Sequence, residues 1–201
     1  MTRRELKARA RAQLGNRIFG SLWMYALLAC LIVSALSGAA GSVIPGIGAL
    51  IVIGPMSYGL NYVFLKQARD GQEMQLGDLF KGFTDDFGQT FLIGLLTSIF
   101  IMLWSLLFVI PGIVKAYAYS MAYYIKVDHP DYDWRRCISE SQAMMKGHKG
   151  ELFMLDLSFI GWLIVGAMCA GVGTLWVAPY MEASRAQFYE SIKTYVLPEN
   201  F

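Results

Sequence analysis

Five polar side chains lie within stretches that are otherwise apolar, and these are the residues that could do chemistry. They are Asp156, Glu182, Arg185, Lys115 and Asn61. Moving an ionised side chain from water into a membrane is costly, so such groups commonly mark a substrate or proton path. Proton transfer, or binding of a polar substrate, is therefore one hypothesis for these residues.

A structural role is the favoured interpretation for the same residues. Glu182 and Arg185 are three positions apart, so their side chains can pair on one helix face. Asp156 lies near the cytoplasmic end of its apolar stretch, and we predict that it pairs with Arg185. Lys115 can extend its ammonium group toward the membrane surface. Structural pairing thus stands ahead of a transport path.

No motif for catalysis, metal binding or cofactor binding is visible in the sequence. His129 and His148 are too far apart for a helical zinc site, and Cys30, Cys137 and Cys169 have no CxxC spacing. No GxSxG, P-loop or dinucleotide fingerprint occurs. We expect no catalytic residue, metal, cofactor or nucleic-acid partner, and we interpret the cysteines as small packing residues.

Tyrosines are frequent in the second and fourth apolar stretches: Tyr58, Tyr62, Tyr117, Tyr119, Tyr123 and Tyr124. An aromatic belt at the membrane interface is the favoured interpretation. Tyr117 and Tyr124 are seven positions apart, so they share a helix face that could instead line a polar crevice.

The composition indicates a membrane protein. Hydrophobic residues make up 56% of the 201 residues and charged residues only 16%, against about 25% charged in soluble domains. Residues 18–65 contain no charge in 48 positions, and residues 89–114 contain none in 26. One spanning helix needs roughly 20 apolar residues, so the first run is long enough for two spans and the second for one.

We predict an all-α fold, a polytopic helical bundle with six spans arranged as three hairpins. The expected spans are 18–40, 45–66, 89–110, 112–128, 151–170 and 174–194, with turns at 44–48, 110–113 and 171–173. Gly and Pro mark these turns. The fourth span is short and the sixth only half apolar, so a four-span arrangement with those two on the surface is the alternative.

The hairpins read as a weak internal repeat within one membrane domain, 1–201. Similar Gly and polar residues precede Phe19, Phe91 and Phe153, which gives units of about 1–70, 71–130 and 131–201. Such units are expected to be parallel repeats around an axis along the membrane normal. Glycines within the spans, Gly54, Gly59, Gly161 and Gly166, are expected to permit close helix contact.

The distribution of positive charge predicts the orientation. Of the 17 Lys and Arg residues, six lie in 1–17, three in 66–88, five in 126–150 and two after 180. Positive residues stay on the cytoplasmic side. The amino terminus and both long loops are therefore expected to be cytoplasmic, and the four-span arrangement also keeps both termini there.

Three cytoplasmic segments have the helical period of amphipathic helices. Their apolar stripes are Leu6, Ala10 and Leu14; Leu76, Leu79, Phe80, Phe83 and Phe87; and Trp134, Cys137, Ile138, Ser141 and Met145. We expect these helices to lie in the headgroup plane, where the arginines of the first segment meet anionic lipid. A docking surface for a protein partner is the alternative.

Several motifs together resemble those of the bacterial integral-membrane family catalogued as domain of unknown function 975. They extend over the whole chain and are most specific in its last third: Gly54-Pro55, Leu79-Phe80, Gly82-Phe83, Ile110-Pro111-Gly112-Ile113, Asp128-His129-Pro130, Met144-Met145-Lys146-Gly147, Leu155-Asp156-Leu157-Ser158, Pro179-Tyr180 and Phe188-Tyr189. The resemblance implies a multi-span protein of the bacterial cell membrane. It implies no activity.

These observations favour a non-enzymatic membrane scaffold or accessory protein. Little intramembrane charge and three amphipathic cytoplasmic segments support this hypothesis. The alternative is a small transporter or lipid-handling protein with a crevice between the hairpins. The expected partners are membrane lipids and a protein at the amphipathic helices, and assembly of several copies is left open.

Overall fold

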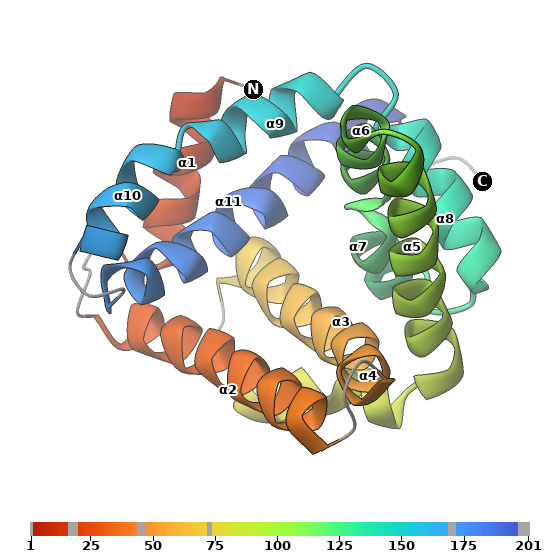
Figure 1. Cartoon of the computed structure of the whole chain (residues 1–201). Coiled ribbons are helices and arrows are strands. Elements are labelled where there is room, and N and C mark those ends of the chain that lie inside the picture. Colours follow the sequence, from red (N-terminus) through yellow and green to blue (C-terminus); the bar gives the residue numbers. More distant parts are fainter. Residues whose placement is uncertain (1, 16–19, 44–46, 72–73, 169–171, 197–201) are drawn as a thin grey trace.

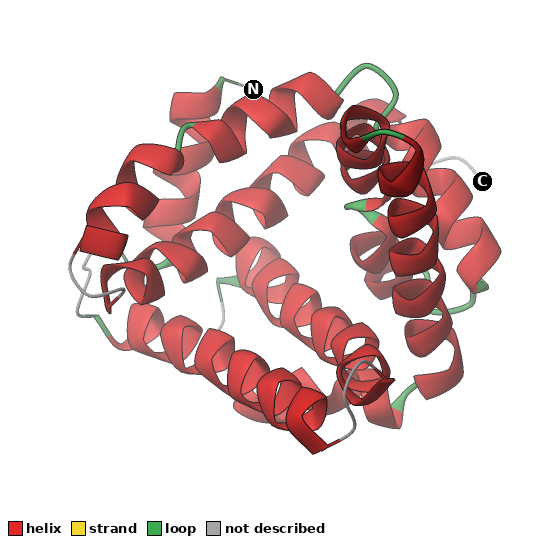
Figure 2. Cartoon of the chain, in the orientation of Figure 1, coloured by secondary structure: helices red, strands yellow, loops and turns green. Residues whose placement is uncertain are grey.

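The computed structural model describes residues 2–15, 20–43, 47–71, 74–168 and 172–196. Its regular structure is entirely helical within these ranges (Figure 2), which confirms the predicted all-α fold. Most of the first expected turn lies outside the described residues, and Cys169 lies wholly outside them.

Three helical hairpins form most of the molecule. Their helices are α2 (Ser21–Val43) with α3 (Ile47–Asp70), α5 (Phe87–Leu107) with α6 (Val109–Tyr119), and α10 (Ile160–Met168) with α11 (Val172–Val196). Helix α7 (Ala122–Asp128) continues the direction of the chain after α6, and α9 (Lys149–Leu157) precedes α10.

The hairpins close into a ring. Each hairpin packs on the second helix of the hairpin before it. Helix α5 packs on α3 and α2 on α11, while the third hairpin contacts α6 through α9, which precedes α10. Figure 1 shows the resulting triangle of hairpins. The last hairpin therefore contacts the first, and each hairpin buries part of its surface against both of the others.

Short helices join the hairpins and follow the same cyclic order. Helix α1 (Arg3–Gln13) packs on α11, the segments η1 (Leu76–Phe80) and α4 (Lys81–Thr84) pack on α3, and α8 (Trp134–Met144) packs on α7. Each joining segment thus covers the second helix of the preceding hairpin, so α1 takes part in closing the ring.

Two expected spans are broken helices. The predicted span 112–128 is interrupted between Tyr119 and Ala122, and the predicted span 151–170 is interrupted between Leu157 and Ile160. A joining helix supplies hydrogen bonds at each break. Ser141 of α8 donates to the carbonyl of Ala118 and accepts from the amide of Met121, while Lys7 of α1 donates to the carbonyl of Ser158. These side chains thereby satisfy backbone groups that are freed at the two breaks.

The second turn lies earlier than the predicted 110–113. Helix α5 ends at Leu107, Phe108 is extended, and α6 begins at Val109. Pro111 therefore lies in the first turn of α6, where the amide that proline lacks would have no partner within the helix. The proline starts a helix here instead of forming the turn.

The apolar stripes of α1 and α8 face protein, which corrects the expectation that they lie against lipid. Leu6, Ala10 and Leu14 are fully or almost fully buried beneath α1, where it packs on α11. The alanines of α11 at positions 183 and 186 are also fully buried, and such small side chains let the two helices approach closely. In the second segment only Leu79 is buried, whereas Phe80, Phe83 and Phe87 are exposed.

Glycines permit close contact at three of the four predicted positions. A methyl group on Gly59 would lie 1.8 Å from the Leu79 carbonyl oxygen, one on Gly54 would lie 2.7 Å from the Thr90 carbonyl oxygen, and one on Gly166 would lie 2.7 Å from the Thr174 amide nitrogen. The expectation is wrong for Gly161, where no atom of another described segment lies within 4 Å of that position.

Among the described helices, two are long and apolar enough to cross a membrane. They are Ser21–Ala40 within α2 and Phe87–Leu107, with mean hydropathy of 2.0 and 2.2. Helix α10, with nine residues, is about 14 Å long and is shorter than a hydrocarbon core of about 30 Å. The number of six spans stays a prediction.

Replacing Gly59 by alanine should destabilise the fold. The added methyl group meets the backbone of η1, which cannot rotate away, so η1 and α4 must shift from α3. We expect a loss of about 3 kcal/mol in the free energy of unfolding, measured by denaturant titration in mild detergent.

Gly88→Ala is the matched control, because no atom of another described segment lies within 4 Å of the new methyl group at this helical position in α5. Its stability should stay equal or rise by up to about 1 kcal/mol. Equal stability of the two variants would contradict the close contact at Gly59.

Candidate functional site

Three of the five predicted polar residues meet in one cluster. Arg185 of α11 lies between two carboxylates: its Nη2 is 3.0 Å from Oδ2 of Asp156 in α9, and its Nη1 is 3.5 Å from Oε1 of Glu182. The Nε of Arg185 is a further 3.3 Å from Oδ1 of Asp156. The predicted pairing of Asp156 with Arg185 is thus present, and it is bidentate.

A tyrosine completes this cluster from the second hairpin. The hydroxyl of Tyr117 in α6 donates to Oδ2 of Asp156 at 3.1 Å, and its ring packs edge-on against Phe153 at 5.8 Å between centroids. Asp156 therefore joins three elements, α6, α9 and α11. The sequence indicated Tyr117 only as a member of a crevice face, because a partner 39 positions away leaves no periodic signal.

The local sequence explains why these side chains converge. Asp156 lies in the last turn of α9, directly before the break at Ser158. Glu182 and Arg185 are one helical turn apart in α11, so they project from the same face. The packing of α9 on α11 then places the carboxylate opposite the guanidinium.

The other two predicted residues lie apart from the cluster. The ammonium group of Lys115 lies 5.1 Å from the centre of the Trp104 ring and 6.0 Å from that of Tyr119, which indicates cation–π contacts. Asn61 donates from Nδ2 to the carbonyl of Ser57 in its own helix, α3. Neither residue has the geometry of a catalytic group.

A cavity of about 280 Å³ adjoins the charged cluster. It lies between α3, α5, α6, α7 and α11, and its lining includes Asn61, Glu182 and Arg185 with Tyr119, Tyr123 and Tyr124. Tyr124 is only 2% exposed, and its hydroxyl has no hydrogen-bond partner within the described part of the chain. The cavity therefore has polar groups that could hold a small polar molecule.

A second ionic cluster, which sequence reasoning missed, joins the carboxyl-terminal parts of α3, α7 and α11, which are called the inner helices below. Asp128 at the end of α7 contacts Arg69 of α3 at 2.6 Å and Lys193 of α11 at 2.7 Å, and it accepts from the hydroxyl of Tyr189 at 2.7 Å. Arg69 also contacts Glu190 at 2.6 Å. These partners lie far apart in sequence, so no spacing rule could reveal them.

The environment of Asp128 determines its ionisation. Burial on its own would raise the pKa of this carboxyl, but the hydrogen bonds from Arg69, Lys193 and Tyr189 outweigh it and hold the pKa below its ordinary value. The side chain of Asp128 is 3% exposed. A buried carboxylate with these donors is a fastening point between helices.

Lys126 provides a neighbouring fastening point. Its side chain is 2% exposed, and its ammonium group donates to Oδ2 of Asp86 at 2.9 Å and to the carbonyls of Pro130 and Tyr132. Asp86 caps the start of α5 by accepting from the amide of Gln89. One buried ammonium thus fixes the start of α5 and the loop before α8.

Removing the charge of Asp128 should weaken the fold in a pH-dependent way. Because the folded-state pKa is lowered, the carboxylate contributes stability above its unfolded pKa of about 3.9 and loses it as the pH falls through the folded value. We expect Asp128→Asn to cost about 3 kcal/mol at pH 7, because Arg69 and Lys193 lose a buried partner.

This loss should shrink as the pH is lowered below about 4, where the wild-type carboxyl also becomes neutral. Unfolding titrations of both proteins at several pH values measure it. Asp131→Asn serves as the control, because Asp131 is exposed and should change stability by less than about 0.5 kcal/mol. A cost for Asp128→Asn that is the same at every pH would contradict this role of the charge.

Comparison with known proteins gives a family but no activity. The model of the family described as "Protein of unknown function (DUF975)" matches residues 1–117 and 106–195. No curated protein and no solved structure matches the chain. Together the two matched segments extend from the joining helix α1 almost to the end of α11. The chain therefore belongs to the DUF975 family of proteins of unknown function.

Proposed function

We propose that this chain is a multi-pass protein of the bacterial cell membrane and acts as a non-enzymatic scaffold or accessory protein. The membrane assignment rests on the exposure of its apolar helices. In the most apolar stretch of α2 only 22% of the residues are buried, and in that of α5 only 17% are buried. The core helix of a soluble protein would be mostly buried, so the low burial favours lipid as the surrounding medium.

The exposed apolar turn of the second hairpin supports this proposal. At the turn between α5 and α6, consecutive large apolar side chains from Leu106 to Ile110 are each at least 64% exposed. Exposed apolar patches of this kind mark a lipid or protein interface. A charge-free turn of this type can enter the membrane, whereas the ionic groups of Asp128 and Lys126 lie at the opposite ends of the inner helices.

The proposed orientation has both termini in the cytoplasm and six spans. The positive residues of α1 and of the loops before α5 and α9 remain inside, and the three hairpin turns lie outside. The rival four-span arrangement leaves the fourth and sixth expected spans on the surface. The shortness of α6, with 11 residues, favours this placement for the fourth span.

Cysteine labelling distinguishes the two arrangements. Phe108→Cys and Val172→Cys are made separately in a chain whose three native cysteines are replaced by alanine, because Phe108 is the exposed residue between α5 and α6. A membrane-impermeant maleimide added to intact cells should label both positions if there are six spans, and only position 108 if there are four. Labelling of neither position, with labelling after cell lysis, would contradict the orientation.

The pairing of the internal charges carries the scaffold interpretation. Arg185 is shared by Asp156 and Glu182, and Asp156 also accepts from Tyr117. These groups satisfy one another, so they act as a fastening between hairpins. No nucleophile paired with a base is found among the described residues of the cluster, which favours an organising role over catalysis.

A small transporter or lipid-handling protein is the second candidate. The cavity of about 280 Å³ and the unpartnered hydroxyl of buried Tyr124 favour it. Glu182 and Arg185 line the cavity, so they could contact a polar substrate as well as each other. In that case the cluster would be needed for transport more than for folding.

Charge exchange separates the two roles of the cluster. Asp156→Asn and Arg185→Gln should each lower stability by about 2 kcal/mol, a value reduced from that of a fully buried pair because both side chains are partly exposed. The double variant Asp156→Arg/Arg185→Asp should regain at least half of the loss, because it restores the ion pair.

Unfolding in mild detergent measures all three variants. Lys115→Gln is the control, because Lys115 lies outside the cluster and should leave the stability within about 0.5 kcal/mol of wild type. Wild-type stability in both single variants would contradict a structural fastening and would favour the transporter.

A further inference from the structure

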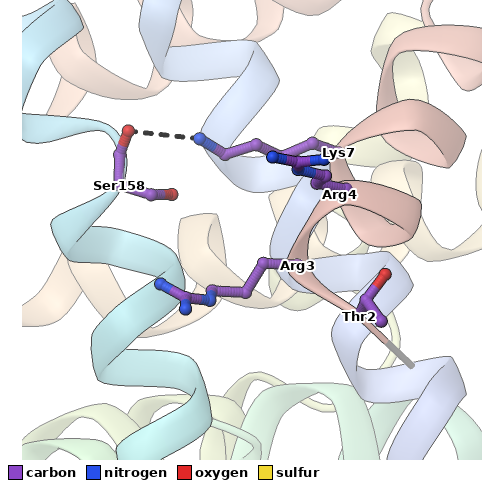
Figure 3. Close-up of a pocket in the computed structure, with 5 residues that line it drawn as sticks. All are labelled: Thr2, Arg3, Arg4, Lys7 and Ser158. Atoms are coloured by element: carbon purple, nitrogen blue, oxygen red, sulfur yellow. Dashed lines mark hydrogen bonds between the residues drawn. The ribbon is translucent and has the colours of Figure 1, made fainter.

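A basic hollow lies where α1 meets the junction of α9 and α10. It has a volume of about 470 Å³ and is lined by Thr2, Arg3, Arg4, Lys7 and Ser158. Figure 3 shows Arg3 and Lys7 both extending from α1 toward α9, with Lys7 ending at the carbonyl of Ser158. Three cationic side chains therefore surround one hollow.

Within the described part of the chain, no carboxylate forms an ion pair with the three cations of this hollow. The nearby Glu151, which lines a neighbouring hollow with Arg3, contacts Nδ1 of His148 at 3.1 Å. Arg3, Arg4 and Lys7 make none of the ion pairs found there, whereas the single acid of α1, Glu5, is engaged in a capping box with Thr2. The partners of Lys7 are neutral: a carbonyl oxygen at 3.1 Å and the face of the Phe159 ring at 4.0 Å.

The position of these cations is unfavourable without a ligand. They lie in the first two turns of α1, where the helix dipole favours negative charge and disfavours positive charge. Burial, followed by the nearby Arg11 and Arg3, lowers the pKa of Lys7. An anion in the hollow would relieve both the repulsion between the cations and their conflict with the dipole.

Apolar surface adjoins the hollow on the side of α9 and α10. Met154 and Leu157 precede Ser158 and are exposed, as are Ile160 and Trp162 just after it. A second hollow of about 830 Å³ shares Thr2 and Arg3 with the first. Its apolar lining includes Leu6, Met154 and Phe188, and its polar lining includes His148 and Glu151. A ligand at this place would meet cations at one end and apolar side chains at the other.

We propose that this hollow binds the headgroup phosphate of an anionic phospholipid whose acyl chains lie along the exposed apolar side chains of α9 and α10. Arg3, Arg4 and Lys7 contact the phosphate oxygens through charge-assisted hydrogen bonds. The lipid binds at the joint between α1 and the third hairpin. This proposal rests on the proposed membrane location of the chain.

Binding is tested with the purified full-length protein in a neutral detergent. Native mass spectrometry, with dioleoyl phosphatidylglycerol or dioleoyl phosphatidylcholine added in increasing amounts, gives the number and affinity of bound lipids. We expect one phosphatidylglycerol to bind at least ten-fold more tightly than phosphatidylcholine. Equal affinities would overturn the proposal, because a purely apolar site does not select charge.

The variant Arg3→Gln/Arg4→Gln should lose this preference. Each cation near a membrane surface contributes about 1 kcal/mol toward an anionic lipid, so affinity for phosphatidylglycerol should fall about 30-fold. Both residues are exposed, so the variant should fold. Without lipid its thermal stability should equal or exceed that of wild type, because the repulsion is removed.

Arg9→Gln/Arg11→Gln is the matched control, with two charges removed from the same helix but outside the hollow. Its affinity for phosphatidylglycerol should stay within about three-fold of wild type. Equal losses in the two double variants would mean that the helix attracts lipid only by diffuse charge, and this would overturn the site.

A free anion is the remaining alternative, and inorganic phosphate tests it. Phosphate at 10 mM, about ten-thousand-fold above a micromolar lipid affinity, should not displace the lipid or raise the thermal stability by itself. Displacement would assign the hollow to a soluble phosphate and overturn the lipid assignment.

Carbonate extraction of cell membranes tests the membrane location separately. A chain that resists extraction but lacks lipid selectivity would contradict the lipid site and leave the proposed membrane location standing.

Discussion

The structure depends on one constraint: backbone polar groups that leave regular hydrogen bonding in an apolar setting must find other partners. Two of the expected spans are interrupted at places where another helix supplies these hydrogen-bond partners. Ser141 binds both sides of the break between α6 and α7, and Lys7 binds the carbonyl of Ser158 at the break between α9 and α10. At Pro55, the proline within α3, Gly82 of α4 approaches the backbone closely. The joining helices therefore complete the backbone hydrogen bonding, or the close packing, of the helices they cover.

This constraint also explains the cyclic order of the packing. Each joining segment lies on the preceding hairpin, α8 and α1 at an interruption and α4 beside Pro55, and the next hairpin then follows in the chain. Repeating that step three times returns the chain to its first hairpin, with α1 on α11. The ionic groups of Asp128 and Lys126 fasten the same elements at the ends of the inner helices, where desolvation of a charge costs less than deep within an apolar layer.

The sequence predicts the positions of the hairpins because long apolar runs and their Gly and Pro residues are local signals. It also predicts the pairing of Asp156 with Arg185, since Glu182 and Arg185 share a helix face and Asp156 is the nearby acid. The breaks at Ser120 and Ser158 are not predictable in this way, because neither contains Gly or Pro and each depends on a partner from another helix. The Asp128 cluster is not predictable for the same reason, because Arg69 and Lys193 reach Asp128 from helices of two other hairpins.

Helix α1 links the fold to the proposed lipid site. Its buried face, with Leu6, Ala10 and Leu14, closes the ring on α11, while Arg3, Arg4 and Lys7 surround the basic hollow. A ligand that contacts α1 and α9 together binds the closed ring and not a chain in which α1 has separated. By mass action such a ligand stabilises the closed state, by about 2.7 kcal/mol when it is present at a hundred times its dissociation constant. Because anionic lipid is part of the membrane itself, closure of the ring would then depend on the composition of the leaflet that α1 contacts.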